Sequence, residues 1–299
     1  MTDTTLHIPV LLHESIDGLN LKPGDVVLDA TFGGGGHSAA IAEKIGPTGT
    51  LVMMDVDPEA FSRIATSGLS KFPCRKLPLL GNFRNARKIL SDHGLLQVNA
   101  VLFDLGVSSY HFETSGRGFS FRKDEPLLMT MGLASGQTAS TLVNEASQAE
   151  LATIFREYGE EEHADLIAEA IVIRRELGPI ATSMELADLI SDTVPGWYRN
   201  RRIHPATKTF QALRIAVNDE FGAIRDGLAG AWTMLAVGGR MAVITFHSLE
   251  DRIVKQIVKE WAAQGSGNLI TKHVIPPSRE ETLKNPRSRS AKLRIIEKK

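Results

Sequence analysis

The sequence predicts an α/β fold with a parallel sheet, interrupted by a block of helices. Short apolar runs alternate with helix-length segments in the first third of the chain and again near its end, which is typical of βαβ units. Between residues 111 and 215 no convincing strand run occurs. We therefore expect residues 1–110 and 216–299 to form an α/β core, and residues 111–215 to form a helical insertion.

The first part of the core carries the clearest alternation. Apolar runs of strand length are separated by segments with helical spacing. The expected strands are Val26–Ala30, Thr50–Asp55, Arg75–Leu80 and Asn99–Asp104, and the expected helices lie near Ser38–Lys44, Pro58–Ala65 and Phe83–Asp92.

The insertion contains helix start signals. Ser147 with Glu150, and Thr182 with Glu185, have the spacing of a capping box, in which each residue of the pair bonds to the backbone of the other. Apolar stripes at helical spacing follow in the same block, so it should be helical with a core of its own.

Beyond the insertion the α/β pattern resumes. A helix around Leu228 leads through a turn at Gly238-Gly239 into a strand at Met241–Phe246. A helix with one apolar face follows. Two further strand candidates, Asn268–Ile275 and Lys292–Glu297, are expected to pair as an antiparallel hairpin at the sheet edge.

Composition restricts the class of protein. The chain has 299 residues, a net charge of −1 and an apolar content of 42%, which suffices for a buried core. Its single cysteine, Cys74, excludes a disulfide scaffold and fits a reducing compartment. The polar start, Met1–His7, and the lack of a long apolar window predict a soluble, cytoplasmic protein. The histidines lack paired ligand spacing, so we expect no metal.

A glycine loop after the first strand predicts a nucleoside site. Gly33–Gly36 follow a strand that ends in Asp29, and Asp55 and Asp57 come about twenty residues later. Glycines let the backbone approach a ligand, and a carboxylate at the tip of the next strand can accept bonds from ribose hydroxyls. Glycine also occurs in ordinary turns, but the succession of strand, glycines, helix, strand and acid favours a nucleoside site. The loop fits the dinucleotide spacing too, so an NAD-dependent oxidoreductase stays open at this point.

Basic residues gather in two stretches. The stretch from Trp197 to Arg214 contains no acid, and the tail from Lys284 to Lys299 contains only Glu297. Two basic stretches on a nearly neutral chain suggest a polyanionic partner, but a run of charge is as often a solvated surface.

Several longer strings are far more specific than the glycine loop. They are His7–Leu12, Thr31–Ser38, Asp104–Ser109, Arg117–Arg122, His204–Arg214, His247–Arg252 and Asn285–Ser290. Together they resemble the bacterial S-adenosylmethionine-dependent methyltransferases that modify the N4 amine of a cytidine in 16S ribosomal RNA. The resemblance implies a seven-stranded, Rossmann-like class I methyltransferase sheet with an inserted all-helical, substrate-binding domain. It favours S-adenosylmethionine over NAD as cofactor.

The same resemblance implies roles for individual residues. Contacts to the methionine end, the ribose and the adenine of the cofactor would come from Gly35, Gly36, His37, Asp55, Phe83, Asp104 and His111. The chain departs from the family at two places. It has His111 where the family has Gln, and Asp124–Gly132 where the family has an acidic stretch that contains Gly-Pro.

The chemistry needs a hydrogen acceptor near the methyl donor. The exocyclic amine of cytosine is a poor nucleophile because its lone pair is delocalised into the ring. A group that accepts the amine hydrogens localises that pair. Asp104, Ser108 and Ser109, beyond the fourth expected strand, are the candidates, although an Asp can equally cap a helix and Ser residues can simply form a turn.

The expected partner is 16S rRNA, within the small ribosomal subunit. A base in structured RNA must leave its stack before it can react, and contacts from basic side chains to the RNA backbone offset that cost. The candidate RNA contacts are Arg199, Arg201, Arg202, His204 and Lys208. No membrane partner is expected, and the oligomeric state is open, with a homodimer as one possibility. Besides the oxidoreductase, a catalytically silent RNA-binding protein with the same fold stays possible at this point.

Overall fold

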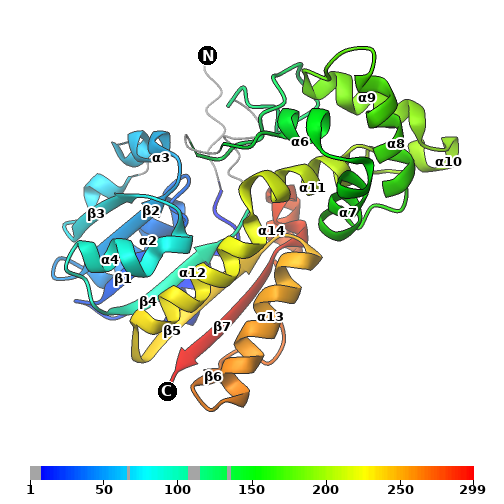
Figure 1. Cartoon of the computed structure of the whole chain (residues 1–299). Helices are drawn as coiled ribbons and strands as arrows, with labels where there is room; N and C mark the ends of the chain where they lie inside the picture. Colours follow the sequence, from blue (N-terminus) through cyan, green and yellow to red (C-terminus); the bar gives the residue numbers. More distant parts are fainter. Residues whose placement is uncertain (1–7, 66–67, 107–114, 133–135) are drawn as a thin grey trace. The chain divides into compact units, whose positions relative to one another are not determined.

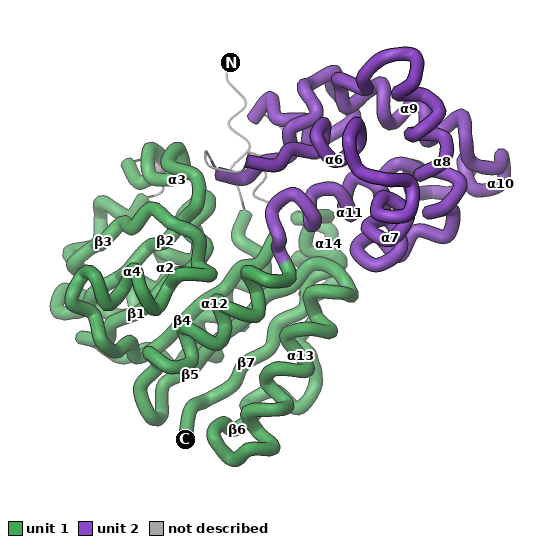
Figure 2. Tube along the Cα trace, viewed as in Figure 1, with its two compact units in different colours: residues 1–106, 221–299 green, residues 107–220 purple. Residues whose placement is uncertain are grey.

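The computed structural model describes residues 8–65, 68–106, 115–132 and 136–299, which belong to two compact units (Figure 2). Unit 1 joins residues 1–106 to residues 221–299, and unit 2 is the segment 107–220. These boundaries lie a few residues from those expected from the sequence. None of the described helices combines the length and apolar character needed to span a bilayer.

Unit 1 is built on one seven-stranded sheet in the order β3-β2-β1-β4-β5-β7-β6 (Figure 1). Neighbouring strands from β3 to β5 are parallel, and β7 is antiparallel to both β5 and β6. The strands are β1 (Val26–Asp29), β2 (Thr50–Asp55), β3 (Arg75–Leu80), β4 (Val98–Asp104), β5 (Leu235–Thr245), β6 (Gly267–Leu269) and β7 (Lys292–Lys298).

Helices cover both faces of this sheet because successive strand side chains point to opposite sides. One face, with Leu28 and Phe103, packs against α4, α12 and α13, and the other, with Val27 and Leu102, packs against α1 and α2. The helices of unit 1 are α1 (Leu12–Leu19), α2 (Gly36–Ile45), α3 (Pro58–Ser62), α4 (Ala86–Asp92), α12 (Glu220–Met234, whose first residue belongs to unit 2), α13 (Ser248–Ala263) and α14 (Arg279–Lys284).

The glycines expected to form a turn, Gly238 and Gly239, fall within the bounds of β5, at a point where Gly238 has a φ of 77°. The pairing of β4 with β5 shifts register between Val98 and Ala100, and a Cβ on Gly239 would lie 2.6 Å from the Asn99 carbonyl oxygen. The glycines therefore permit a close backbone approach at an irregularity in the ladder.

The expected antiparallel hairpin at the sheet edge is confirmed, although β6 is shorter than the expected strand. Ile275, at the end of the expected range, makes only an isolated bridge to Leu293.

The described residues of unit 2 form helices and loops around a separate apolar core, with one isolated bridge between Pro126 and Thr182. The capping box of Ser147 and Glu150 is confirmed. Thr182 accepts from the backbone of Glu185, but the Glu185 carboxylate binds the Ala181 backbone and Arg174 instead of completing the box. The helices are α6 (Ala139–Glu145), α7 (Gln148–Gly159), α8 (Ala164–Arg175), α9 (Ser183–Thr193), α10 (Gly196–Arg199) and α11 (Thr207–Asn218).

Candidate functional site

Three neighbouring parallel strands each end in an aspartate. Asp29 ends β1, Asp55 ends β2 and Asp104 ends β4. Because the strands are parallel and adjacent, these carboxylates lie at the same edge of the sheet, where open α/β sheets bind ligands. The predicted cofactor residues Asp55 and Asp104 therefore share one site, and Asp29 joins them.

The glycine loop is fastened to Asp55. One carboxylate oxygen of Asp55 accepts from the Gly33 N–H at 2.8 Å, and the other accepts from the Asp57 N–H at 2.9 Å. Gly33 and Gly35 have φ values of 50° and 77°, which favour glycine. Asp55 thus positions the loop, and the ribose contact expected for it stays a prediction.

Gly36 is required for packing. A Cβ on this residue would lie 2.9 Å from the Cγ of Pro9. Close contact with Pro9 therefore explains why a glycine opens α2, and it brings together two of the strings that carry the family resemblance.

His37 joins the N-terminal segment to Asp104. Its buried ring places Nε2 3.0 Å from the Val10 carbonyl oxygen and Nδ1 3.6 Å from Asp104 Oδ2. Since a carbonyl can only accept, Nε2 carries a hydrogen, and the other ring nitrogen, Nδ1, faces Asp104. The ring of His37, and not only its backbone, is therefore part of the site.

Asp104 has the most perturbed carboxyl group of the site. Burial, followed by repulsion from Asp29 and Glu250, raises its pKa to about 8. Its backbone N–H donates to Thr31 Oγ1 at 2.7 Å, and its Oδ1 has no hydrogen-bond partner among the described residues. A carboxyl with an uncommitted oxygen in a negative environment suits a ligand that brings a positive charge and an N–H or O–H donor.

Asp29 is a supporting member of the same cluster. Its carboxylate accepts from Ser38 Oγ at 2.6 Å and from the Thr31 N–H at 3.2 Å. Burial is the main cause that raises its pKa to about 6. The sequence marked Asp29 only as the end of a strand, and its position before the glycine loop was the signal that it belongs to the site.

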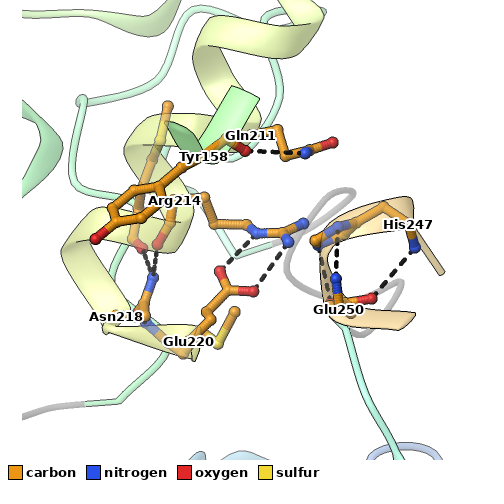
Figure 3. A network of polar contacts seen from close by, with 9 residues as sticks. Tyr158, Gln211, Arg214, Asn218, Glu220, His247 and Glu250 are labelled. Carbon is orange, nitrogen blue, oxygen red and sulfur yellow. Dashed lines mark hydrogen bonds and ion pairs between the residues drawn. The ribbon is translucent and has the colours of Figure 1, made fainter. Parts of the chain in front are cut away.

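His247 and Glu250 cap α13 (Figure 3). The Glu250 carboxylate accepts from the backbone N–H groups of Phe246 and His247 at 2.8 and 3.2 Å, and His247 Nδ1 accepts from the Glu250 N–H at 3.4 Å. This is the geometry of a capping box, which supports a structural role for His247. Glu250 was not predicted as a site residue, yet its charge acts on Asp104.

Phe83 opens the short helix Phe83–Asn85 after β3. Its ring meets Phe103 edge-on at a centroid distance of 5.6 Å. A Cβ on Gly227 would lie 2.5 Å from the Phe83 ring, so the glycine makes room for it. Phe83 is thus partly buried under α12, and the adenine contact expected for it stays a prediction.

The basic stretch of unit 2 is largely neutralised by acids of the same unit. The Arg201 guanidinium lies over the rings of Trp197 and Tyr198, with centroid distances of 4.7 and 4.6 Å, and pairs with Glu162 at 2.6 Å. Lys208 donates to the Glu160 carbonyl oxygen at 2.8 Å. An uninterrupted basic face, which the stretch alone suggested, is therefore not what the fold presents.

The remaining members of this stretch differ in their surroundings. Arg199 lies 4.0 Å from an Asp192 carboxylate oxygen. His204 stacks on Phe121 at 4.4 Å, and burial lowers its pKa, which leaves the ring uncharged near neutrality. Arg202 is exposed and has no acidic partner among the described residues.

The string His204–Arg214 continues into a polar network that holds unit 2 together (Figure 3). Arg214 makes a bidentate ion pair with the buried Glu220 carboxylate, at 2.7 and 2.9 Å. Asn218 donates to the Met129 carbonyl oxygen and accepts from the Met131 N–H. These bonds fasten the segment in which the chain departs from the family pattern, and Met129, like Leu127, is fully buried there.

Three predicted residues, Ser108, Ser109 and His111, lie outside the described residues. Within the described ranges, no group of three or more His, Cys, Asp or Glu side chains is placed to hold a metal ion.

The strand order, with β7 antiparallel beside the last parallel strand, and the glycine loop fastened to a strand-end carboxylate define a class I methyltransferase. Residues 4–299 match the MraW methylase family, and the chain belongs to this family. It is a methyltransferase whose cofactor is S-adenosylmethionine, and the reading as a nicotinamide-dependent oxidoreductase is thereby set aside. The negative cluster around Asp104 fits this cofactor, which carries a cationic sulfur.

Curated relatives are similar over the whole length. Proteins named ribosomal RNA small subunit methyltransferase H from Heliobacterium modesticaldum and Trichlorobacter lovleyi are 46% and 44% identical to this chain, each over 98% of both chains. The protein of that name from Deinococcus radiodurans is 44% identical over 99% of this chain and 90% of its own.

Proposed function

We propose that the chain transfers a methyl group from S-adenosylmethionine to the N4 amine of a cytidine in 16S rRNA of the small ribosomal subunit, in the cytoplasm. The names of the full-length relatives support RNA of the small subunit as the substrate. The N4 position is supported by the sequence strings and by one structural observation, the partly buried Asp104 carboxyl with an uncommitted oxygen.

Different residues of unit 1 would bind different parts of the cofactor. Asp55 and the Gly33–Gly36 loop would hold the nucleoside part of the cofactor, and His37 with Asp104 would flank its reactive end. When bound, S-adenosylmethionine supplies an electrophilic methyl group on a cationic sulfur. The negative charges of Asp29, Asp104 and Glu250 favour a cation at this place.

Asp104 would orient the amine and hold the proton that it loses. A carboxylate oxygen that accepts an amine N–H draws the lone pair away from the ring and toward attack. A neighbouring cation keeps Asp104 ionised, and once that charge is gone its pKa returns toward about 8. The group can then keep the proton at neutral pH. Ser108, Ser109 and His111 stay candidates for further contacts to the amine and the cofactor.

The rival function is that of a silent RNA-binding protein, which the two departures from the family pattern keep open. Incubation of the purified protein with S-adenosylmethionine and with unmethylated small subunits or 16S rRNA separates the two. The proposal expects labelled methyl groups in 16S rRNA and N4-methylcytidine among its nucleosides. Binding of RNA without methyl transfer to either substrate would contradict it.

A further inference from the structure

A second group of basic residues in unit 1 lines a cavity between α13 and the β6–β7 region. The cavity has a volume of about 280 Å³, and its charged lining consists of Lys255 and Lys259 from α13, Lys272 and His273 from the loop after β6, and Arg294 from β7. None of these residues has a role in the site described above.

The charge around this cavity is not balanced locally. Arg294 is buried and pairs with Asp251 at 2.8 and 3.1 Å. Lys255, Lys259 and Lys272 are exposed, and the described residues provide no ion pair to any of them. No acid lines the cavity in the described part of the chain. Gathering ammonium groups around one space costs electrostatic energy, which a bound anion would relieve.

The size of the cavity limits the anion that fits. Pockets for drug-sized ligands have volumes of about 300–1,000 Å³, and a water takes about 30 Å³. A cavity of about 280 Å³ therefore has room for a phosphate group together with some of its waters.

The basic lining continues outside the cavity along α13. A shallower hollow next to it shares Lys255 and Lys259 and adds Arg252. These three residues are spaced i, i+3 and i+7, so they form one stripe on the helix. The acid in that hollow, Glu260, accepts from Gln256 Nε2 at 3.0 Å. A stripe of several cations suits a chain of phosphates better than a single free ion.

We propose that this cavity and the adjoining stripe of α13 bind backbone phosphates of the RNA substrate. The inference rests on the proposed function and adds to it a substrate contact on the methyltransferase unit itself.

The test compares two triple variants with the wild-type protein. The first is Lys255→Gln with Lys259→Gln and Lys272→Gln. The control, Lys22→Gln with Lys44→Gln and Lys71→Gln, removes the same charge from exposed lysines of unit 1 outside the cavity. Affinity for unmethylated small ribosomal subunits is measured over a range of salt concentrations. Calorimetry measures the affinity for S-adenosylmethionine and for inorganic phosphate.

The cavity variant should bind subunits about tenfold more weakly or worse at low salt, with a salt slope lower by about two, since each lost phosphate contact removes about 0.7–0.9. The control should keep the wild-type slope, and both variants should keep their affinity for S-adenosylmethionine. An unchanged slope in the cavity variant overturns the inference. So does a site that binds free inorganic phosphate while subunit affinity is unaffected. If the wild-type protein itself neither binds nor methylates subunits, the proposed function fails first and the inference falls with it.

Discussion

At the scale of single residues, Asp55 has two tasks, and its replacement by Ala removes both. It fastens the glycine loop through Gly33, and it is proposed to hold the ribose of the cofactor. Asp55→Ala should weaken binding of S-adenosylmethionine by roughly 1.5–3 kcal/mol, about ten- to a hundredfold, because charge-assisted hydrogen bonds are lost. Asp55→Asn, which keeps one acceptor oxygen, should lose less. Calorimetry that finds the same affinity for Asp55→Ala and wild type would remove Asp55 from the site.

The buried Asp104 carboxyl should lower the free energy of unfolding when it is ionised. Its pKa is raised from 3.8 to about 8, so between these values the folded state binds a proton that the unfolded state lacks. The contribution of Asp104 to the free energy of unfolding therefore falls as the pH rises between these two values. Asp104→Asn should raise the free energy of unfolding near pH 8 by on the order of 2 kcal/mol, with little change near pH 4. The same variant should lose methyl transfer.

Denaturant unfolding of both proteins at the two pH values checks this prediction. A loss of stability in Asp104→Asn near pH 8 would contradict it. That outcome would mean that Asp104 is ionised and paired with a charged His37, its neighbour at 3.6 Å.

The positions of the acids at the strand ends could be predicted from the sequence, but the charged residues that lie near them in the fold could not. Asp55 and Asp104 could be placed because parallel strands bring their carboxyl ends to one edge. Glu250 could not, because its effect on Asp104 depends on how α13 packs, and neither could the pairing of Arg201 with Glu162. Such pairs join residues that only the folded chain brings together.

At the scale of elements, α10 and the turn that follows it carry the arginines expected to contact RNA. Replacing Arg199, Arg201 and Arg202 with Ala should spare S-adenosylmethionine binding, since the cofactor residues belong to unit 1. It should weaken subunit binding and lower the salt slope by about one or more. Because Arg201 is paired and stacked while Arg202 has no acidic partner among the described residues, Arg202→Ala alone should account for most of the change. Normal binding with an unchanged slope in the triple variant would mark the stretch as a solvated surface.

The boundaries of the strands show which local sequence signals were sufficient to predict them. Strands β2 and β3 coincide with their expected ranges because both are short segments between helices, although β3 begins with Arg75 and Lys76. The start of β5 was missed because Gly238-Gly239 signals a turn, whereas β5 begins at Leu235, which pairs with Val98 before the register shifts. The tail was expected to be a basic surface, yet Arg294 is buried in its pair with Asp251, and Lys298 donates to backbone carbonyls of Trp232 and Leu235.

At the scale of the whole molecule, the strand-end carboxylates and the arginines expected to contact RNA belong to different units. Unit 1 holds the strand-end carboxylates and the glycine loop, and unit 2 has its own apolar core and its own network of charge pairs. The alternation of strands and helices predicts an α/β unit in two parts with a helical segment between them. The local charge balance of unit 2 could not be predicted, because acids and bases that are distant in sequence meet only in the fold.

The central claim, N4 methylation of a cytidine in 16S rRNA, is tested most directly by mass analysis of nucleosides from 16S rRNA of a strain that lacks this protein. We predict that N4-methylcytidine is reduced in that RNA, that the wild-type chain restores it, and that Asp104→Asn does not. An undiminished level of N4-methylcytidine in the strain without the protein, or its full restoration by Asp104→Asn, would contradict the account.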